Sequence, residues 1–176
     1  SMGLSTMDSG ILARQPEIKK NMDPRVSTIY FLARRLGAWL LAVAVAYLLA
    51  SATATQYVIA QLAGMGIGVP LGERAAMTLQ DVRGMAGLFL PMVAFALLVA
   101  FMAAALLCRW LSQWRLPLYL LAGAVGVVAI HLLLHLAFGL TPIAIARSTG
   151  GLLLQALAGA VGGFTYLFLI SRQSRD

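Results

Sequence analysis

The amino-acid sequence predicts an all-α integral membrane protein, folded as a four-transmembrane-helix bundle with both termini on the cytoplasmic side (N-in/C-in). Of the 176 residues, 61% are hydrophobic and only 11% are charged, and the mean hydropathy is +0.88. In a soluble domain about a quarter of the residues are charged, and a soluble domain of this size could not bury so much apolar surface away from water. Four apolar stretches, each about 20 residues long as a membrane-crossing helix requires, give the number of spans.

The N-terminal region combines a polar tail with the first span. Residues 1–22 have no periodic apolar face, so they are predicted to be disordered. The transmembrane domain then covers residues 23–170, because Asp23 and Pro24 are typical of the N-cap and the first turn of a helix. The first span covers about residues 36–58, which at about 1.5 Å per residue reach roughly 35 Å and can cross a bilayer.

The second span follows a break and a short polar segment. Glycines are spaced closely over residues 64–70, a pattern that ends helices, and residues 71–83 are predicted to form a short surface helix. Thr78 and Asp81 have the spacing of a capping box for a span over about residues 85–107. Pro91 lies inside that range, where it is predicted to bend the helix or to free a carbonyl group.

The third and fourth spans complete the bundle. A turn over residues 109–115, with two tryptophans and two arginines, is typical of a membrane–water interface. The third span covers about residues 117–138, beginning at a proline. The fourth covers about residues 151–170, with Ser148 or Thr149 as its N-cap. Residues 171–176 are a polar C-terminal tail.

The distribution of basic residues predicts the orientation. Of the 13 Lys and Arg residues, only Arg74, Arg83 and Arg147 lie on the side away from the two termini. Cytoplasmic segments of membrane proteins are enriched in basic residues. The termini are therefore assigned to the cytoplasm, and the protein to a multi-pass location in a bacterial inner membrane. The formal net charge of +7 then reflects topology, and the predicted partner is the lipid bilayer and not nucleic acid.

Small residues predict how the helices pack. Alanines recur at four-residue spacing in the first span, glycines do so in the fourth, and small residues let membrane helices approach closely. We expect these patterns to join helices within one chain. The alternative is a homo-oligomer or larger membrane complex that uses the outer face of the fourth helix. The residues concerned are Ala42, Ala46, Ala50, Ala54, Ala122, Gly126, Gly159 and Gly163.

His131 and His135 stand one turn apart in the third span, a spacing that lets two imidazoles share a metal ion. A transition-metal site needs further ligands, and the single cysteine, Cys108, lies near the cytoplasmic end of the second span. Haem needs axial ligands from opposite sides, so this pair would require another chain. We expect no cofactor and two imidazoles that hydrogen-bond within the bundle; a transition metal or haem held by these residues is the alternative.

Polar side chains gather in the half of the spans that faces outward. Counting along each helix places His131, Gln155 and Ser51 at a similar depth. Such groups usually face the bundle or a water-filled cavity, so the sequence predicts a polar pocket roofed by charged loops. The alternative is that these groups only satisfy one another. The candidate ligand-binding residues are Ser51, Thr55, Asp81, Arg83, His131, His135, Arg147 and Gln155.

No motif indicates an enzyme. The sequence has neither a phosphate-binding glycine loop nor a Gly-x-Ser-x-Gly nucleophile elbow, and no carboxylate pair lies inside a span. The favoured interpretation is a non-enzymatic membrane protein that binds a small molecule or lipid at the polar pocket, or acts as a subunit of a membrane complex. One alternative is a metal, haem or quinone redox protein that uses His131 and His135. The other is a small oligomeric channel or transporter. The spans contain no acid or lysine, which argues against a proton- or cation-coupled transporter that works by itself.

Overall fold

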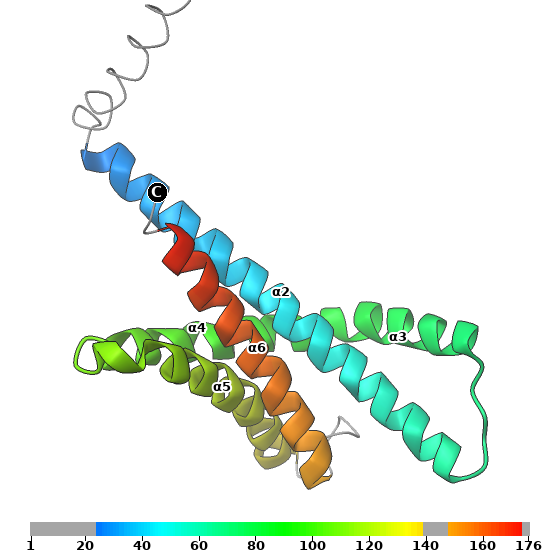
Figure 1. The fold of residues 1–176 in the computed structure, drawn as a ribbon. Helices are drawn as coiled ribbons and strands as arrows, with labels where there is room; N and C mark the ends of the chain where they lie inside the picture. The colour runs from blue at the N-terminus through cyan, green and yellow to red at the C-terminus, as the bar shows by residue number, and fades with distance from the viewer. Residues whose placement is uncertain (1–23, 139–147, 174–176) are drawn as a thin grey trace, which may run out of the picture. The chain divides into compact units, whose positions relative to one another are not determined.

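The computed structural model describes residues 24–138 and 148–173, and all regular secondary structure within them is helical (Figure 1). The chain divides into two compact units, residues 1–36 and 37–176, and the second unit holds the helix bundle. The predictions for residues 1–22 and for Arg147 lie outside the described residues. The elements are α2 (Pro24–Gly64), α3 (Leu71–Ala86), α4 (Phe89–Leu107), the short 3-10 helix η1 (Ser112–Trp114), α5 (Arg115–Phe138) and α6 (Thr149–Gln173).

Four of the described helices are long and apolar enough to cross a membrane, in α2 (Thr28–Gly64), in α4 (Phe89–Leu107), over Ser112–Leu136 and in α6 (Thr149–Arg172). This confirms the all-helical class and the four long apolar helices. Large hydrophobic side chains cover their outward faces; Phe95, Leu133 and Leu157 are 70%, 63% and 61% exposed. Monomeric soluble proteins rarely expose large contiguous apolar surfaces, so the four helices suggest a multi-pass membrane protein.

α2 extends beyond the first predicted span. It begins at Pro24 and continues for 41 residues. At about 1.5 Å per residue it is about 60 Å long, roughly twice the thickness of the hydrocarbon core. The polar second half of the predicted span lies within this helix, and two of its residues, Ser51 and Thr55, are buried. α2 ends at Gly64, where the predicted break begins, and Gly66 has a φ of 83°, which glycine adopts without steric cost.

The boundary between α3 and α4 differs from the predicted one. α3 runs to Ala86, so the residues expected to begin the second span belong to α3 instead, and α4 begins at Phe89. The predicted capping box is wrong, because Thr78 and Asp81 lie inside α3. Pro91 falls in the first turn of α4, where its missing N–H breaks no helical hydrogen bond. The proline therefore marks the start of the span instead of a bend within it.

The start of α6 agrees with the prediction. The backbone N–H of Gly151 donates to Ser148 Oγ at 3.0 Å, which is the contact that an N-cap serine makes with the first turn. α6 then begins at Thr149 and continues to Gln173, three residues beyond the predicted end of the fourth span.

Small residues bring the helices together. A Cβ added at Gly123 of α5 would overlap the carbonyl group of Gly159 in α6, and one at Gly162 of α6 would come within 2.8 Å of Ala46 Cβ in α2. Figure 1 shows α6 beside α5 and crossing α2. The α6 glycines thus pack within the chain, as expected, and the sequence reasoning missed Gly123. The alanine stripe of α2 is buried as well: Ala42, Ala46, Ala50 and Ala54.

Three aromatic rings fill another part of the bundle. Phe101 of α4 stacks on Tyr166 of α6 with ring centroids 4.7 Å apart. Tyr119 of α5 lies 5.8 Å from Phe101 and 5.5 Å from Tyr166. Such ring pairs add stability beyond the area that they bury. They connect α4, α5 and α6, and they were not predicted because each residue stands alone in its own apolar segment.

Candidate functional site

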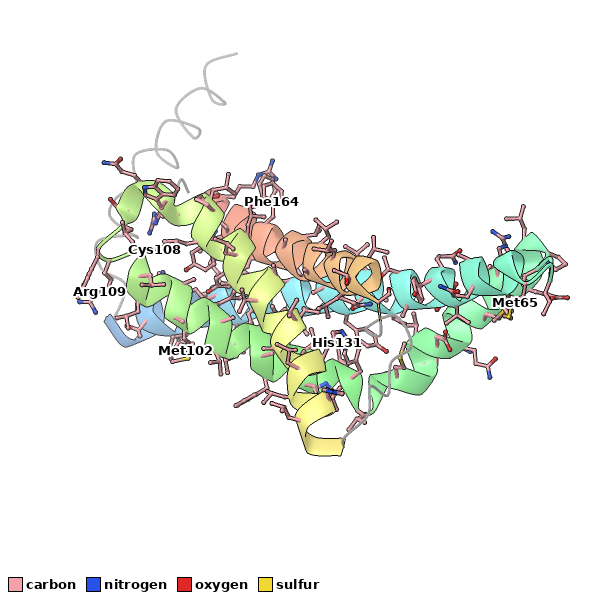
Figure 2. The ribbon with its side chains drawn as sticks, turned by 90° about the horizontal axis from the view of Figure 1, so that it is seen from below. Met65, Met102, Cys108, Arg109, His131 and Phe164 are labelled. Atoms are coloured by element: carbon pink, nitrogen blue, oxygen red, sulfur yellow. The ribbon has the colours of Figure 1, made fainter. Side chains whose placement is uncertain are left out.

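Polar side chains from three helices are buried in the bundle. Within the described part of the chain, Ser51 and Thr55 of α2, His131 of α5 and Gln155 of α6 are each at most 4% exposed. All four were predicted from their depth along the helices. Figure 2 shows Cys108 and Arg109 at one end of the bundle and His131 toward the other. Burying polar groups costs free energy unless they are hydrogen-bonded, so the partners of these four side chains decide what the cluster can do.

Gln155 joins α6 to α2. Its Nε2 donates to the carbonyl oxygen of Ala50 at 2.9 Å. That bond fixes the orientation of the amide, because the flipped amide would place two acceptor oxygens against each other. Gln155 Oε1 is consequently turned away from Ala50. The His131 ring is its side-chain neighbour, although neither Gln155 Oε1 nor His131 Nε2 makes a hydrogen bond of normal geometry.

Thr55 joins α2 to α3. Its Oγ1 lies 2.8 Å from Asp81 Oδ2 and 3.1 Å from the carbonyl oxygen of Ser51. A hydroxyl has one proton, so Thr55 donates to one of these oxygens at a time. The Asp81 carboxylate is the better acceptor, because hydrogen bonds to charged groups are stronger. The capping residue predicted for the second span is therefore a contact between α3 and the buried cluster.

Two further hydrogen bonds hold α3 against α2. The Tyr47 hydroxyl donates to the carbonyl oxygen of Val82, and Gln56 Nε2 donates to Thr78 Oγ1 at 3.3 Å. α3 itself buries no residue. Val82, Met85 and Ala86 of α3 are partly buried against the hydrophobic core, so apolar contacts and hydrogen bonds together hold α3 in place.

Aromatic rings border the cluster. The Phe89 ring of α4 lies 5.8 Å from the His131 ring and 6.2 Å from the Tyr47 ring, measured between centroids. Neither aromatic residue was among the predicted site residues. Tyr47 had a usable signal, because it stands one turn before Ser51 on α2 and so shares its face. Phe89 had none, since the sequence reasoning placed it inside the second span.

Three polar atoms of the cluster are buried without a hydrogen bond of normal geometry. They are Ser51 Oγ, His131 Nε2 and Gln155 Oε1, each from a different helix. The described residues contain one other such atom, Trp39 Nε1. Trp39 stands twelve positions before Ser51 on α2, about 18 Å along the helix axis. The unpaired polar atoms are thus concentrated at one level of the bundle.

Three predicted site residues do not join this cluster. His135 and Arg83 are exposed, and Arg147 lies outside the described residues. Arg83 lines a shallow hollow on α3 together with Ala76, Leu79, Gln80 and Gly84. His135 was predicted from its depth along the helix, and depth alone does not show which way a side chain turns.

The described residues do not assemble a metal centre. Among residues 24–138 and 148–173, no group of three or more His, Cys, Asp or Glu side chains could hold a metal ion. His131 is 4% exposed and His135 is exposed, so the two imidazoles occupy different environments. Cys108 is buried against the hydrophobic core.

We expect Thr55→Val to loosen α3 from α2. The substitution keeps the shape of the side chain but leaves the partly buried Asp81 carboxylate without its donor, which costs about 1–3 kcal/mol. Hydrogen exchange of the α3 amides should accelerate in the variant. Thr165→Val is the matched control, because the Thr165 hydroxyl bonds only the Val161 carbonyl of its own helix. Equal exchange in α3 for both variants would contradict the role given to Thr55.

Comparisons with protein-family models, with curated proteins and with solved structures found no match to this chain. Function is therefore inferred from the geometry of the cluster.

Proposed function

We propose that this chain is a non-enzymatic, multi-pass membrane protein that binds the polar head of a small, membrane-soluble molecule at the buried cluster of Ser51, His131 and Gln155. The ligand would be a lipid or another amphiphile, with its apolar part among the hydrophobic helix surfaces. The surrounding bilayer supplies such molecules directly to these surfaces.

The observation that carries the proposal is the set of three unpaired polar atoms. Leaving a buried donor or acceptor unsatisfied costs about 1–3 kcal/mol for each group, and native structures contain few such groups. Here Ser51 Oγ, His131 Nε2 and Gln155 Oε1 belong to three different helices. Gln155 is the neighbour of His131 and bonds Ala50, the residue next to Ser51. A ligand head that satisfied these atoms would recover much of that cost on binding.

The proposed location is the outer half of an inner membrane, with both termini in the cytoplasm. The support is the distribution of basic residues, since cytoplasmic segments are enriched in Lys and Arg. The cluster belongs to the side of the bundle where α2 leads into α3, and the described basic residues of that side are Arg74 and Arg83. Under this orientation a ligand would enter from the outer leaflet.

The proposal predicts a bound molecule that depends on His131 and Gln155. Wild-type protein extracted in polymer-bounded native bilayers should carry a small-molecule adduct in native mass spectrometry. Gln155→Leu and His131→Phe remove the polar atoms at similar size, and we expect each to reduce the adduct at least tenfold, equivalent to about 1.4 kcal/mol.

Two control variants test whether the effect is local. Gln80→Leu and His135→Phe change the same residue types at exposed positions, so both should retain the adduct. Retention of the adduct by all four variants would contradict the proposal. Replacement of the small adduct by a second polypeptide would instead favour the role of a subunit in a membrane complex.

A further inference from the structure

We infer that the head group bound at this cluster is a hydrogen-bond donor without negative charge, a hydroxyl or an amine, and that anionic heads are excluded. This inference rests on the proposed function and specifies its ligand. It follows from the direction of one hydrogen bond, from the formal charge that Asp81 brings to the cluster, and from the rings beside it.

Gln155 requires a donor. Because Gln155 Nε2 is committed to the Ala50 carbonyl at 2.9 Å, the free atom of the amide is Oε1. An amide oxygen only accepts hydrogen bonds. Ser51 Oγ and His131 Nε2 can act as donor or acceptor, according to the hydroxyl rotamer and the imidazole tautomer. His131 neighbours Gln155 and can offer one donor to Oε1. An amide oxygen has two lone pairs, so a ligand that contacts Oε1 must bring a further donor, and the two adaptable groups can match its remaining atoms.

The charge next to the cluster is negative. Asp81 contacts Thr55, and the Thr55 hydroxyl also reaches the Ser51 carbonyl. A phosphate or carboxylate placed beside Ser51 would be repelled by this carboxylate and would lose its hydration. Burying an unpaired anion costs several kcal/mol, and like charges in a low-dielectric region add to that cost.

The described arginines on this side do not offset Asp81. Arg74 donates its Nε to the Val69 carbonyl at 3.0 Å, and Arg83 is exposed on α3. His135 is exposed as well.

The aromatic border also favours a donor head. The Phe89 ring lies between the Tyr47 and His131 rings, with centroid distances of 6.2 and 5.8 Å. Aromatic faces attract cations and repel anions through the ring quadrupole. These rings would therefore strengthen the binding of an amine, leave that of a hydroxyl nearly unchanged and weaken that of a carboxylate.

The inference can be tested with three probes that share the same hydrocarbon tail and differ only in their head group. Hexadecylamine, hexadecanol and hexadecanoate are added to the full-length protein in phosphatidylcholine nanodiscs, and bound probe is counted by native mass spectrometry. We expect the amine or the alcohol to bind at least tenfold tighter than the carboxylate. Non-specific attraction to a protein of net charge +7 favours the carboxylate, so a donor preference would run against that background.

Variants show whether the preference arises at the cluster. Gln155→Met keeps the volume and removes the acceptor, so it should remove the preference, whereas Gln80→Met should keep it. Hexadecanoate binding as tightly as the donor probes would overturn the inference, even if it depended on Gln155, and would leave the proposed function intact. Donor probes that bind equally to wild type and Gln155→Met would also overturn the inference. If His131→Phe retained the native adduct, the proposed function itself would be overturned.

Discussion

Gly123→Ala is expected to destabilise the bundle strongly, because the added methyl group would collide with the backbone of a neighbouring helix. The new Cβ would overlap the backbone carbonyl of Gly159, which cannot move without displacing α6. Overpacking costs about 1–3 kcal/mol and more where rigid groups collide, which exceeds the gain of about 1 kcal/mol in helix propensity. We expect a net loss of at least 2 kcal/mol, measured by unfolding in mixed detergent micelles.

Gly37→Ala is the matched control. Gly37 also lies in a long apolar helix, but a Cβ added there meets no atom within 4 Å. This variant should be neutral or more stable, because alanine favours the helix. If Gly123→Ala were as stable as Gly37→Ala, α5 and α6 could not be as close as the structure places them.

Ala46→Leu is expected to separate α2 from α6. Ala46 is fully buried, and its Cβ faces Gly162 of α6. A leucine here must push the helices apart, at a cost of about 3 kcal/mol. The displacement should also break the hydrogen bond from Gln155 to the Ala50 carbonyl, one turn along α2. We therefore expect the variant to lose both stability and the bound adduct.

Ala44→Leu separates this effect from a general change in hydrophobicity. Ala44 is two residues away on α2 and is exposed, so a leucine there should face lipid and leave unfolding within about 0.5 kcal/mol of wild type. The same unfolding assay compares the two variants. A loss of stability for Ala44→Leu as large as for Ala46→Leu would contradict the helix faces assigned to α2.

The helices could be predicted from the sequence because apolar length determines which segments can cross a bilayer. The boundary between α3 and α4 could not. Met85 and Ala86 are apolar, so hydropathy assigned them to the span, whereas Gly87 and Leu88 form the turn that separates the helices. Pro91 indicates the correct boundary, because proline is favoured in the first turn of a helix and so marks the start of α4 instead of a bend inside the span.

The sequence predicted the level along the helices at which the cluster lies, but not which face of each helix meets the other helices. Counting residues placed Ser51, His131 and Gln155 at one level, and the structure buries all three. His135 was also predicted as a site residue, because it lies one helical turn from His131, but its side chain is exposed. Which face of α5 meets the other helices depends on contacts such as that of Gly123 with Gly159, and a single sequence does not contain that information.

Under the proposed function, His131 Nε2 has no hydrogen bond of normal geometry in the empty protein and gains one when the ligand head binds. The chain has two histidines, so the exposed His135 can be replaced by phenylalanine to leave a single imidazole. Solid-state NMR of this ¹⁵N-histidine-labelled variant in bilayers then reports on one site. We expect the Nε2 resonance to shift when extracted native lipids are added back to the stripped protein. An unchanged resonance, in a sample whose bound adduct has returned, would contradict the claim.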